Sequence, residues 1–220
     1  MNLKISDEIR NAAPDYKALV ITGDVVNSET PEELLSLIDR LSTSIRETIA
    51  IPDINRRPGI AATREGYKKC GKDPNRYRPS QEALMRRIVK GNDLYRIDAI
   101  VDLVNLLSLQ SGYSIGAFDL DKIDGDTLTL GIGREGEPYE GIGRGELNIE
   151  GMPVWRDSTG GVGTPTSDNE RTKIDMSTRR LLMIINIYGD EMPVDEISQR
   201  AIELLERFAS GSNLSARVIA

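Results

Sequence analysis

The spacing of apolar and polar residues predicts strands and helices that alternate along the first half of the chain. The apolar run at residues 18–22 is typical of a buried strand. A helix is expected to follow from Pro31, because Thr30 suits the N-cap position and Glu33 completes a capping box. Its apolar stripe consists of Leu34, Leu37, Ile38, Leu41, Ile45 and Ile49.

Further helices and strands are expected along the rest of the chain. The helices are predicted at residues 61–69, 80–90, 93–109 and 194–209, and Ile97 is expected in the core stripe of the third of these. The strands are predicted at residues 114–118, 127–132, 146–149, 153–156, 180–188 and 214–219. This mixed α/β (α+β) pattern contains no obvious linker. We therefore predict one compact domain over residues 1–220, with a mixed sheet flanked by helices.

The absence of histidine restricts the chemistry more than any other feature of the composition. It excludes Ser-His-Asp and Cys-His catalysis, and it removes the usual general base at neutral pH. It also removes histidine zinc ligands, which the single cysteine cannot replace, so neither a metal nor a cofactor is expected. Any reaction must use carboxylates, lysine, tyrosine, hydroxyls, backbone groups, water or the substrate itself.

Cysteine usage and hydropathy indicate where the protein works. A single cysteine excludes an internal disulfide, and no apolar run reaches the roughly 18 residues of a membrane span. Asp7 and Glu8 stand where a signal peptide would have its apolar core. We expect a cytoplasmic protein with no membrane partner, and the sequence leaves its oligomeric state open.

Positive charge is concentrated in one segment of an acidic chain. The whole chain has 28 Lys and Arg against 35 Asp and Glu, yet residues 56–96 contain 12 basic and 4 acidic residues. Such a segment can bind a polyanion locally. Arg78, Arg86, Arg87 and Lys90 are the candidate RNA contacts. The alternative is a helix face that is merely solvated by its arginines.

Three short motifs are better explained without a site. Residues 131–136 match G-x-G-x-x-G, but Pro138 and further glycines follow where a dinucleotide site needs a helix. The acidic run at residues 119–126 lacks the glycine and glutamate spacing of a calcium loop and is interpreted as a turn between strands. Cys70 has lysines nearby that would lower its pKa, but without a histidine partner we interpret it as a structural thiol.

Several motifs in a fixed order carry a resemblance to a known family. They are residues 79–91 (PSQEALMRRIVKG), 101–109 (VDLVNLLSL), 115–125 (IGAFDLDKIDG), 136–137 (GE) and 167–174 (SDNERTKI). Together they resemble the B3/B4 tRNA-editing domain of the phenylalanyl-tRNA synthetase β subunit, over about residues 57–188. The chain has no room for the other synthetase modules, so aminoacylation is not expected.

The resemblance implies a mixed α/β module that hydrolyses tyrosine wrongly attached to phenylalanine tRNA. An apolar synthetic pocket for phenylalanine rejects the additional hydroxyl of tyrosine poorly. A second, polar site therefore improves the discrimination between the two amino acids. The implied partners are tRNA or aminoacyl-tRNA and an aromatic amino acid or a related small molecule. The alternative is a binding module for an amino acid, a small molecule or RNA that has lost the editing reaction.

The resemblance also implies site residues. Asn105 matches an asparagine of the editing pocket, and Asp168 stands where the family has the glutamate of a Ser-Glu pair, so both are predicted to be catalytic. Gly116 stands where the bacterial form has a histidine. Residues 160–166 are expected to supply backbone N–H groups to an ester. The predicted substrate-binding residues are Gly116, Phe118, Glu137, Gly163, Thr164 and Ser167.

Each of the two predicted catalytic residues also has a structural interpretation. Asn105 is the right residue type for a buried amide bonded to the backbone. Asp168, beside Ser167, is the right type for the cap of a helix or turn.

Overall fold

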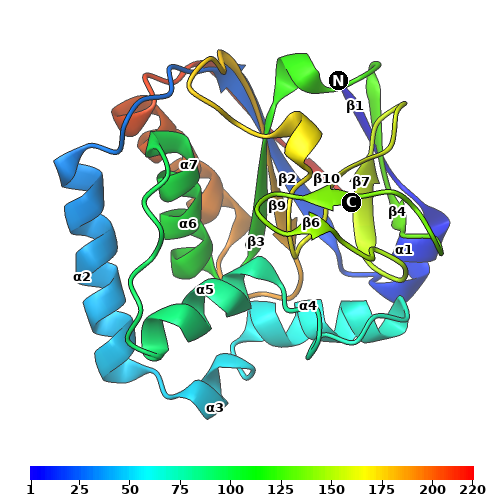
Figure 1. Cartoon of the computed structure of the whole chain (residues 1–220), viewed down its shortest axis with the longest axis horizontal. Coiled ribbons are helices and arrows are strands. Elements are labelled where there is room, and N and C mark those ends of the chain that lie inside the picture. The colour runs from blue at the N-terminus through cyan, green and yellow to red at the C-terminus, as the bar shows by residue number, and fades with distance from the viewer.

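The computed structural model of the chain describes residues 1–220 and arranges them in three layers, which are helices, an antiparallel sheet and a second sheet (Figure 1). The helices are α1 (Asp7–Ala12), α2 (Glu32–Thr48), α3 (Ile51–Ile54), α4 (Pro58–Lys69), α5 (Ser80–Val89), α6 (Ala99–Ser111) and α7 (Val194–Phe208), with 3-10 turns η1 (Leu120–Lys122) and η2 (Glu170–Thr172). No helix combines the length and the apolar character that crossing a bilayer requires. The mixed α+β class predicted from the sequence is confirmed.

The middle layer is an antiparallel sheet with the strand order β10-β2-β9-β3. Its strands are β10 (Ser212–Ile219), β2 (Lys17–Asp24), β9 (Arg180–Ile187) and β3 (Ser114–Asp119). Strand β9 has apolar side chains on both faces, so it must be covered on both sides. Strand β3 lies at one edge of the sheet, and this edge becomes the wall of a cavity.

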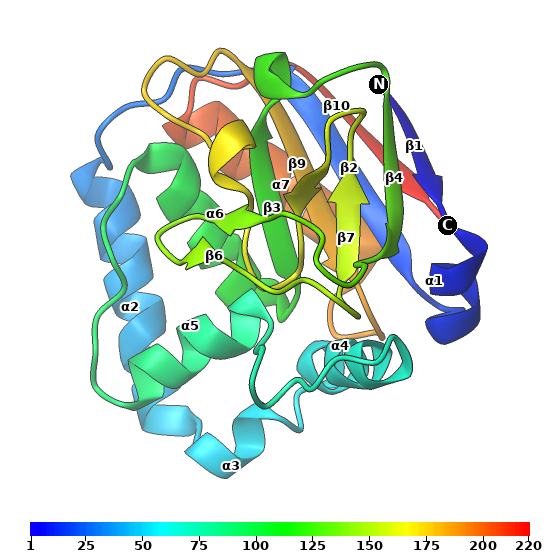
Figure 2. The ribbon, with the colours of Figure 1, turned by 45° about the vertical axis from the view of Figure 1, so that its right-hand side comes forward.

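Helices cover one face of this sheet. Helices α2, α6 and α7 pack against it and bury a core of 24 residues, to which Met183 and Ile185 of β9 belong (Figures 1 and 2). Helix α6 is buried along most of its length, because α2, α5 and α7 surround it. Side chains of α6 that face the edge of the sheet are therefore held rigidly.

A second sheet covers the other face. Its strand order is β1-β4-β7-β8, with β1 parallel to β4 and the other neighbours antiparallel. These strands are β1 (Asn2–Ile5), β4 (Thr127–Ile132), β7 (Pro153–Arg156) and β8 (Gly161–Gly163), and a separate hairpin is formed by β5 (Glu140–Gly141) and β6 (Gly145–Glu146). Trp155 and Phe118 are fully buried between the two sheets. The mixed sheet is thus the outer one, and helices cover only one face of the antiparallel sheet.

Two predicted helix starts are wrong, and a buried aspartate explains each correction. Helix α2 begins at Glu32 without any side-chain cap, because the Thr30 hydroxyl donates to the buried Asp102 carboxylate at 2.6 Å instead. Helix α6 begins at Ala99, not at residue 93, because Asp98 caps it by accepting the Val101 N–H. Residues 93–98 form an irregular strap, and Ile97, predicted to be in the core, is 60% exposed.

The periodicity missed short elements and misplaced one strand. The elements β1, α1, α3 and β8 contain too few apolar residues for a period to be visible. The strand predicted at residues 146–149 is wrong, because β6 stops at Glu146 and Ile149 is buried in a loop. The interpretation that residues 131–136 are not a dinucleotide site is confirmed, since they form the end of β4 and a loop, and no helix follows.

The close approach of the loop at Ile149 explains the glycine at position 133. A Cβ atom at Gly133 would collide with the Ile149 carbonyl oxygen, whereas a Cβ atom at Gly160 would meet no atom within 4 Å. We predict that Gly133→Ala lowers the free energy of unfolding by about 3 kcal/mol. Gly160→Ala is the matched control and should change it by less than about 0.5 kcal/mol. Chemical denaturation of both variants checks this, and equal stabilities would contradict the packing argument.

Candidate functional site

A cavity of about 520 Å³ opens at the free edge of β3, beneath α6. Its walls come from the start of α6, from β3, from the β5–β6 hairpin and from residues 164–168 and 173–176. Half of the lining is apolar: Ile97, Val101, Val104, Ile115, Ala117, Ile142, Ile174 and Met176. Ligand pockets typically combine this size with apolar walls and a few polar groups.

The structure brings four of the predicted site residues together in this cavity. Asn105 comes from α6, and Thr164, Ser167 and Asp168 come from the turn after β8. These residues are about sixty positions apart in the sequence, so the cavity exists only in the folded chain.

The carboxyl group of Asp168 sits at the inner edge of this cavity. Its Oδ2 accepts the backbone N–H of Ala117 at 3.1 Å, and no protein group donates to Oδ1. This contact spans 51 positions of sequence, so Asp168 is not a local cap; Asn169 instead caps η2. No lysine or arginine forms an ion pair with Asp168. Oδ1 therefore has no hydrogen-bond donor in the protein, and it lies against Gly116 and Gly163.

Desolvation makes Asp168 an unusual acid. Burial raises the pKa of its carboxyl to about 8, and the N–H of Ala117 opposes this rise only in part. At neutral pH the group is mostly protonated and can donate a hydrogen bond, while a modest rise in pH makes it a base. Strongly shifted acids of this kind are concentrated at functional sites.

Asn105 presents a free side-chain amide to the same space. It has intermediate exposure and lines both the cavity and a small pocket between α6, α2 and the strap at residues 93–98, and its amide makes no hydrogen bond to the protein. The structural interpretation, a buried amide bonded to backbone, therefore does not hold for this residue. A free amide can both donate to and accept from a bound ligand.

The turn that carries Asp168 is held by hydrogen bonds of its own. The Ser167 carbonyl accepts from the Tyr139 hydroxyl at 2.7 Å, and from the N–H and hydroxyl of Thr164 at 3.1 and 3.0 Å. The Thr164 hydroxyl in turn accepts the N–H groups of Thr166 and Ser167. Two of the backbone amides expected to bind an ester, those of Thr164 and Thr166, are thus already bonded within the turn.

Buried polar contacts anchor this turn to the rest of the fold. The Pro165 carbonyl accepts from the Ser80 N–H at 2.7 Å and from the Ser114 hydroxyl at 2.9 Å. The hydroxyls of Tyr67 and Thr166 are 2.8 Å apart. Because α4, α5 and β3 all contribute, the position of Asp168 relative to β3 is fixed from several directions.

Gly116, Gly163 and Phe118 lie behind the carboxyl group. A Cβ atom at Gly116 or Gly163 would come within 3.0 or 2.9 Å of Asp168 Oδ1, and both would also crowd the Phe118 ring. Phe118 is fully buried in the core between the sheets. These residues therefore make room for Asp168 and support it, and they do not line the cavity.

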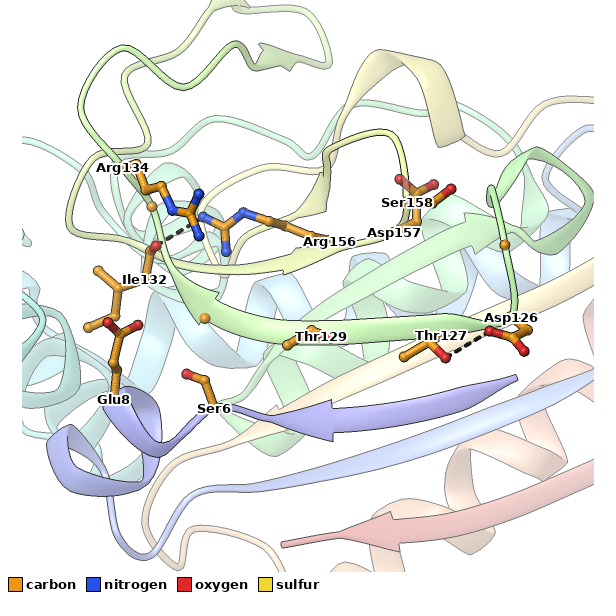
Figure 3. A pocket seen from close by; sticks show the side chains of 13 residues that line it. Ser6, Glu8, Asp126, Thr127, Thr129, Ile132, Arg134, Arg156, Asp157 and Ser158 are labelled. Atoms are coloured by element: carbon orange, nitrogen blue, oxygen red, sulfur yellow. Dashed lines mark hydrogen bonds between the residues drawn. The ribbon is translucent and has the colours of Figure 1, made fainter.

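Glu137 belongs to a different hollow. It lines a hollow of about 910 Å³, and its carboxylate binds the Arg156 guanidinium at 2.5 and 2.6 Å. Arg156 in turn lines a polar groove of about 660 Å³ on the outer face of β4 (Figure 3). Figure 3 shows Arg134 and Arg156 side by side at one end of this groove and Asp126 and Thr127 at the other. Glu137 is thus absent from the cavity that holds Asp168.

The predicted RNA contacts differ in their availability. Arg86 is committed to the fully buried Glu82 at 2.7 Å, which Arg64 also binds at 2.9 Å. Arg87 donates to the Asp93 carbonyl and stacks on the Tyr95 ring at 3.9 Å. Arg78 and Lys90 are exposed.

The structure adds residues that the sequence did not point to. Ala117 contributes only its N–H, which any residue possesses, so no sequence signal could have identified it. The apolar walls Ile142 and Met176 come from irregular segments without periodicity. At Cys70, burial raises the pKa to about 11, opposite to the effect expected of the neighbouring lysines. No cluster of acidic residues and cysteine is arranged to hold a metal ion.

Comparison with known proteins gives a matching family and similar solved structures. A family described as the B3/4 domain matches residues 62–209. Among solved structures, the chain is similar to an N-terminal fragment of the phenylalanyl-tRNA synthetase β subunit from Pyrococcus horikoshii, with 12% identity and a TM-score of 0.48. The similarity covers 100% of this chain and 54% of that fragment, so the chain spans about half its length. No curated protein matches the chain.

The raised pKa of Asp168 predicts that this residue destabilises the fold at neutral and alkaline pH. The unfolded chain releases the proton above about pH 4, whereas the folded chain retains it up to about pH 8. Stability contributed by the proton is therefore lost as pH rises between these values. We predict that Asp168→Asn raises the free energy of unfolding by about 1–2 kcal/mol at pH 8 and leaves it almost unchanged at pH 4.

Denaturant titrations at the two pH values check this prediction. Asp190→Asn, which changes an exposed carboxylate, is the control and should behave like the wild type at both. A loss of stability at pH 8 in the Asp168 variant would mean that the carboxylate has a cationic partner in the folded protein.

Proposed function

This chain belongs to the B3/4 domain family, and from that membership we propose that it is a trans-acting editing hydrolase that removes a wrongly attached amino acid from tRNA. The observation that carries the proposal is the cavity that gathers Asp168, Asn105, Thr164 and Ser167 behind apolar walls. Its size suits an amino acid, and the raised pKa of its Asp168 carboxyl group suits a reaction.

The proposed reaction is the hydrolysis of an aminoacyl ester. The oxygen of water bonds to the carbonyl carbon while its proton passes to the Asp168 carboxylate. The bond from that carbon to the ribose oxygen then breaks, and Asp168 returns the proton to this oxygen, which becomes the ribose hydroxyl. A base with a pKa of about 8 is well matched to this step near neutral pH.

Asn105 is proposed to replace the backbone amides that were expected to stabilise the oxyanion. Its side-chain amide has no protein partner, whereas the N–H groups of Thr164 and Thr166 are bonded within their own turn. One donor directed at a developing oxyanion lowers the barrier by about 3 kcal/mol. Thr164 and Ser167 are proposed to contact the amino acid from the opposite wall.

The basic segment is proposed to bind the tRNA. Arg78, just before α5, and Lys90, just after it, are exposed, and Arg87 in its last turn is partly exposed. Arg86 supports this surface indirectly, because it neutralises the buried Glu82. Contacts of this kind to phosphates depend on salt and not on sequence.

A deacylation panel tests the proposal. We predict that the purified protein accelerates the loss of tyrosine from mischarged phenylalanine tRNA, and that Asp168→Asn reduces kcat roughly 100-fold or more. Asp190→Asn serves as the matched control and should retain full activity. The proposal fails if Tyr-, Phe- and other aminoacyl-tRNAs all remain intact at high protein concentration.

The pH dependence of the same reaction tests the role of Asp168. We predict that the rate that depends on Asp168 rises with pH and levels off above about pH 8, because only the ionised carboxyl accepts the proton. The rate of Asp168→Asn at each pH is subtracted as the background. A plateau that already begins near pH 5 would indicate a carboxylate with an ordinary pKa.

A second candidate function is binding without hydrolysis. The internal bonding of the turn amides and the absence of histidine favour it, since both remove groups that assist ester hydrolysis. In that case the cavity would bind a free aromatic amino acid or a related small molecule. Thermal stabilisation by such a ligand, together with intact mischarged tRNA, distinguishes this function from the first.

A further inference from the structure

A buried carboxylate with one unused oxygen lies in the wall of the cavity. Asp98 is 6% exposed and lines the cavity at the start of α6. Its Oδ1 accepts the Val101 N–H at 2.9 Å, and its Oδ2 accepts no hydrogen bond from the protein. No buried side-chain oxygen of this chain is both sealed from solvent and without a partner. Oδ2 is therefore reached from the cavity, where a ligand can approach it.

The backbone amides at the start of α6 leave nothing to occupy this oxygen. The Ala99 N–H donates to the Ser28 carbonyl at 2.9 Å. The Ile100 N–H donates to the Asn27 side chain at 3.2 Å, and the third N–H of the helix is the one that binds Oδ1. Capping needs one side-chain oxygen and no charge, since asparagine and serine cap a helix as well as aspartate does. The fold thus explains neither the second oxygen of Asp98 nor its charge.

No cation of the protein neutralises Asp98. Lys173, the only lysine or arginine that lines the cavity, is paired with Glu170. Arg96 is close in sequence, but it pairs with an aspartate of α2 at 3.9 Å. Burial raises the pKa of the neighbouring Asp102, and the negative charge of Asp98 raises it further. A buried carboxylate without a cation is unfavourable, so this wall of the cavity favours a cationic ligand group.

The other two aspartates of the cavity cannot take this role. Asp175 is paired with Lys122 at 2.6 Å. Asp168 is mostly protonated at neutral pH, because burial raises its pKa to about 8. Asp98 is therefore the carboxylate of the cavity that is available to a cation. A site with a buried polar group discriminates strongly against ligands that leave this group unpaired.

We propose that Asp98 binds the α-ammonium group of the amino acid in the cavity and restricts the site to esters whose amino group is free. Asp98 and Asn105 are two helical turns apart, so they lie on the same side of α6 with about 10 Å between them along its axis. An ammonium group at Asp98 and an ester carbonyl at Asn105, each with a hydrogen bond of about 3 Å, fit this separation. Only the α-carbon separates the α-nitrogen from the ester carbon, so Asp98 is a positioning residue for the carbonyl group.

This inference rests on the proposed function and adds a specificity to it. An acyl or peptidyl group on the amino nitrogen converts the cation into a neutral amide and places additional bulk against the buried Asp98. Esters of free amino acids are therefore accepted, and esters of N-acylated amino acids or of peptides are rejected. The same contact also serves the binding of a free amino acid without hydrolysis.

Two small ligands and one isosteric variant test this role. Tyrosine methyl amide carries the ammonium group, whereas N-acetyl-tyrosine methyl amide has the same side chain without the charge. By isothermal titration calorimetry at about pH 6.5, where the amine is charged, we expect the wild type to bind the first ligand roughly 30-fold more tightly or better. Asp98→Asn should weaken the first ligand roughly 30-fold and the second less than about twofold, because asparagine keeps the cap and loses the charge.

Two further variants separate the charge from the fold. Asp98→Ser also retains a capping oxygen without the charge, and it should lose the preference for the ammonium ligand in the same way. Asp190→Asn changes an exposed carboxylate away from the cavity and should bind both ligands as the wild type does. Thermal unfolding of each variant verifies that the fold is intact.

The possible results have distinct meanings. If the wild type binds both ligands equally, or if Asp98→Asn weakens both to the same extent, the role of Asp98 is overturned, while removal of tyrosine from tRNA still supports the proposed function. Preferential binding of the ammonium ligand without deacylation supports the role of Asp98 and favours the binding-module function. If the wild type binds neither ligand, the role of Asp98 is overturned, and the deacylation panel decides the proposed function separately.

Discussion

Strand β9 imposes the constraint on which the rest of the structure depends. Seven of its eight residues are buried, and apolar side chains point to both faces, so the strand is stable only between two covering layers. Helices α2, α6 and α7 supply one layer, and the second sheet supplies the other. The single polar residue in its interior, Asn186, bonds to Tyr16 at 2.8 Å and to Trp155 at 3.3 Å, which ties the two sheets together. The three-layer architecture follows from this one strand.

The same architecture creates the site. Strand β3 ends the central sheet, so an N–H of its outer edge needs a partner that no further strand supplies. The turn after β8 brings the Asp168 carboxylate to the Ala117 N–H, and Gly116 and Gly163 leave the necessary space. The carboxyl is thereby removed from water without gaining a cation, which raises its pKa to about 8. A group that destabilises the fold but is firmly positioned is what a reactive site requires.

The sequence predicted the long elements well because each has a clear period. Strands β2, β4, β7 and β9 and helices α2 and α7 lie close to their predicted positions. The errors occur where a polar contact overrides the local preference. Asp102 binds Thr30, which removes a capping box, and Asp98 caps α6, which leaves the preceding residues as a strap. Glu82 binds Arg86 and so removes it from the predicted RNA surface. Thr30 and Asp102 are 72 positions apart, so no local pattern reveals that pair, whereas the Asp98 cap and the Glu82–Arg86 pair span three and four positions.

The sequence by itself determined the mixed α+β class, the absence of histidine chemistry and the family, because these depend on composition, period and ordered motifs. It also indicated Asn105, Thr164, Ser167 and Asp168, which the fold gathers in one cavity. Only the tertiary structure decided the rest. It separated Glu137 from the cavity, placed Phe118 behind it and exposed Ile97 at its mouth. The physical reason is that exposure, desolvation and pairing are properties of neighbours in space, and the chain brings those neighbours together only when it folds.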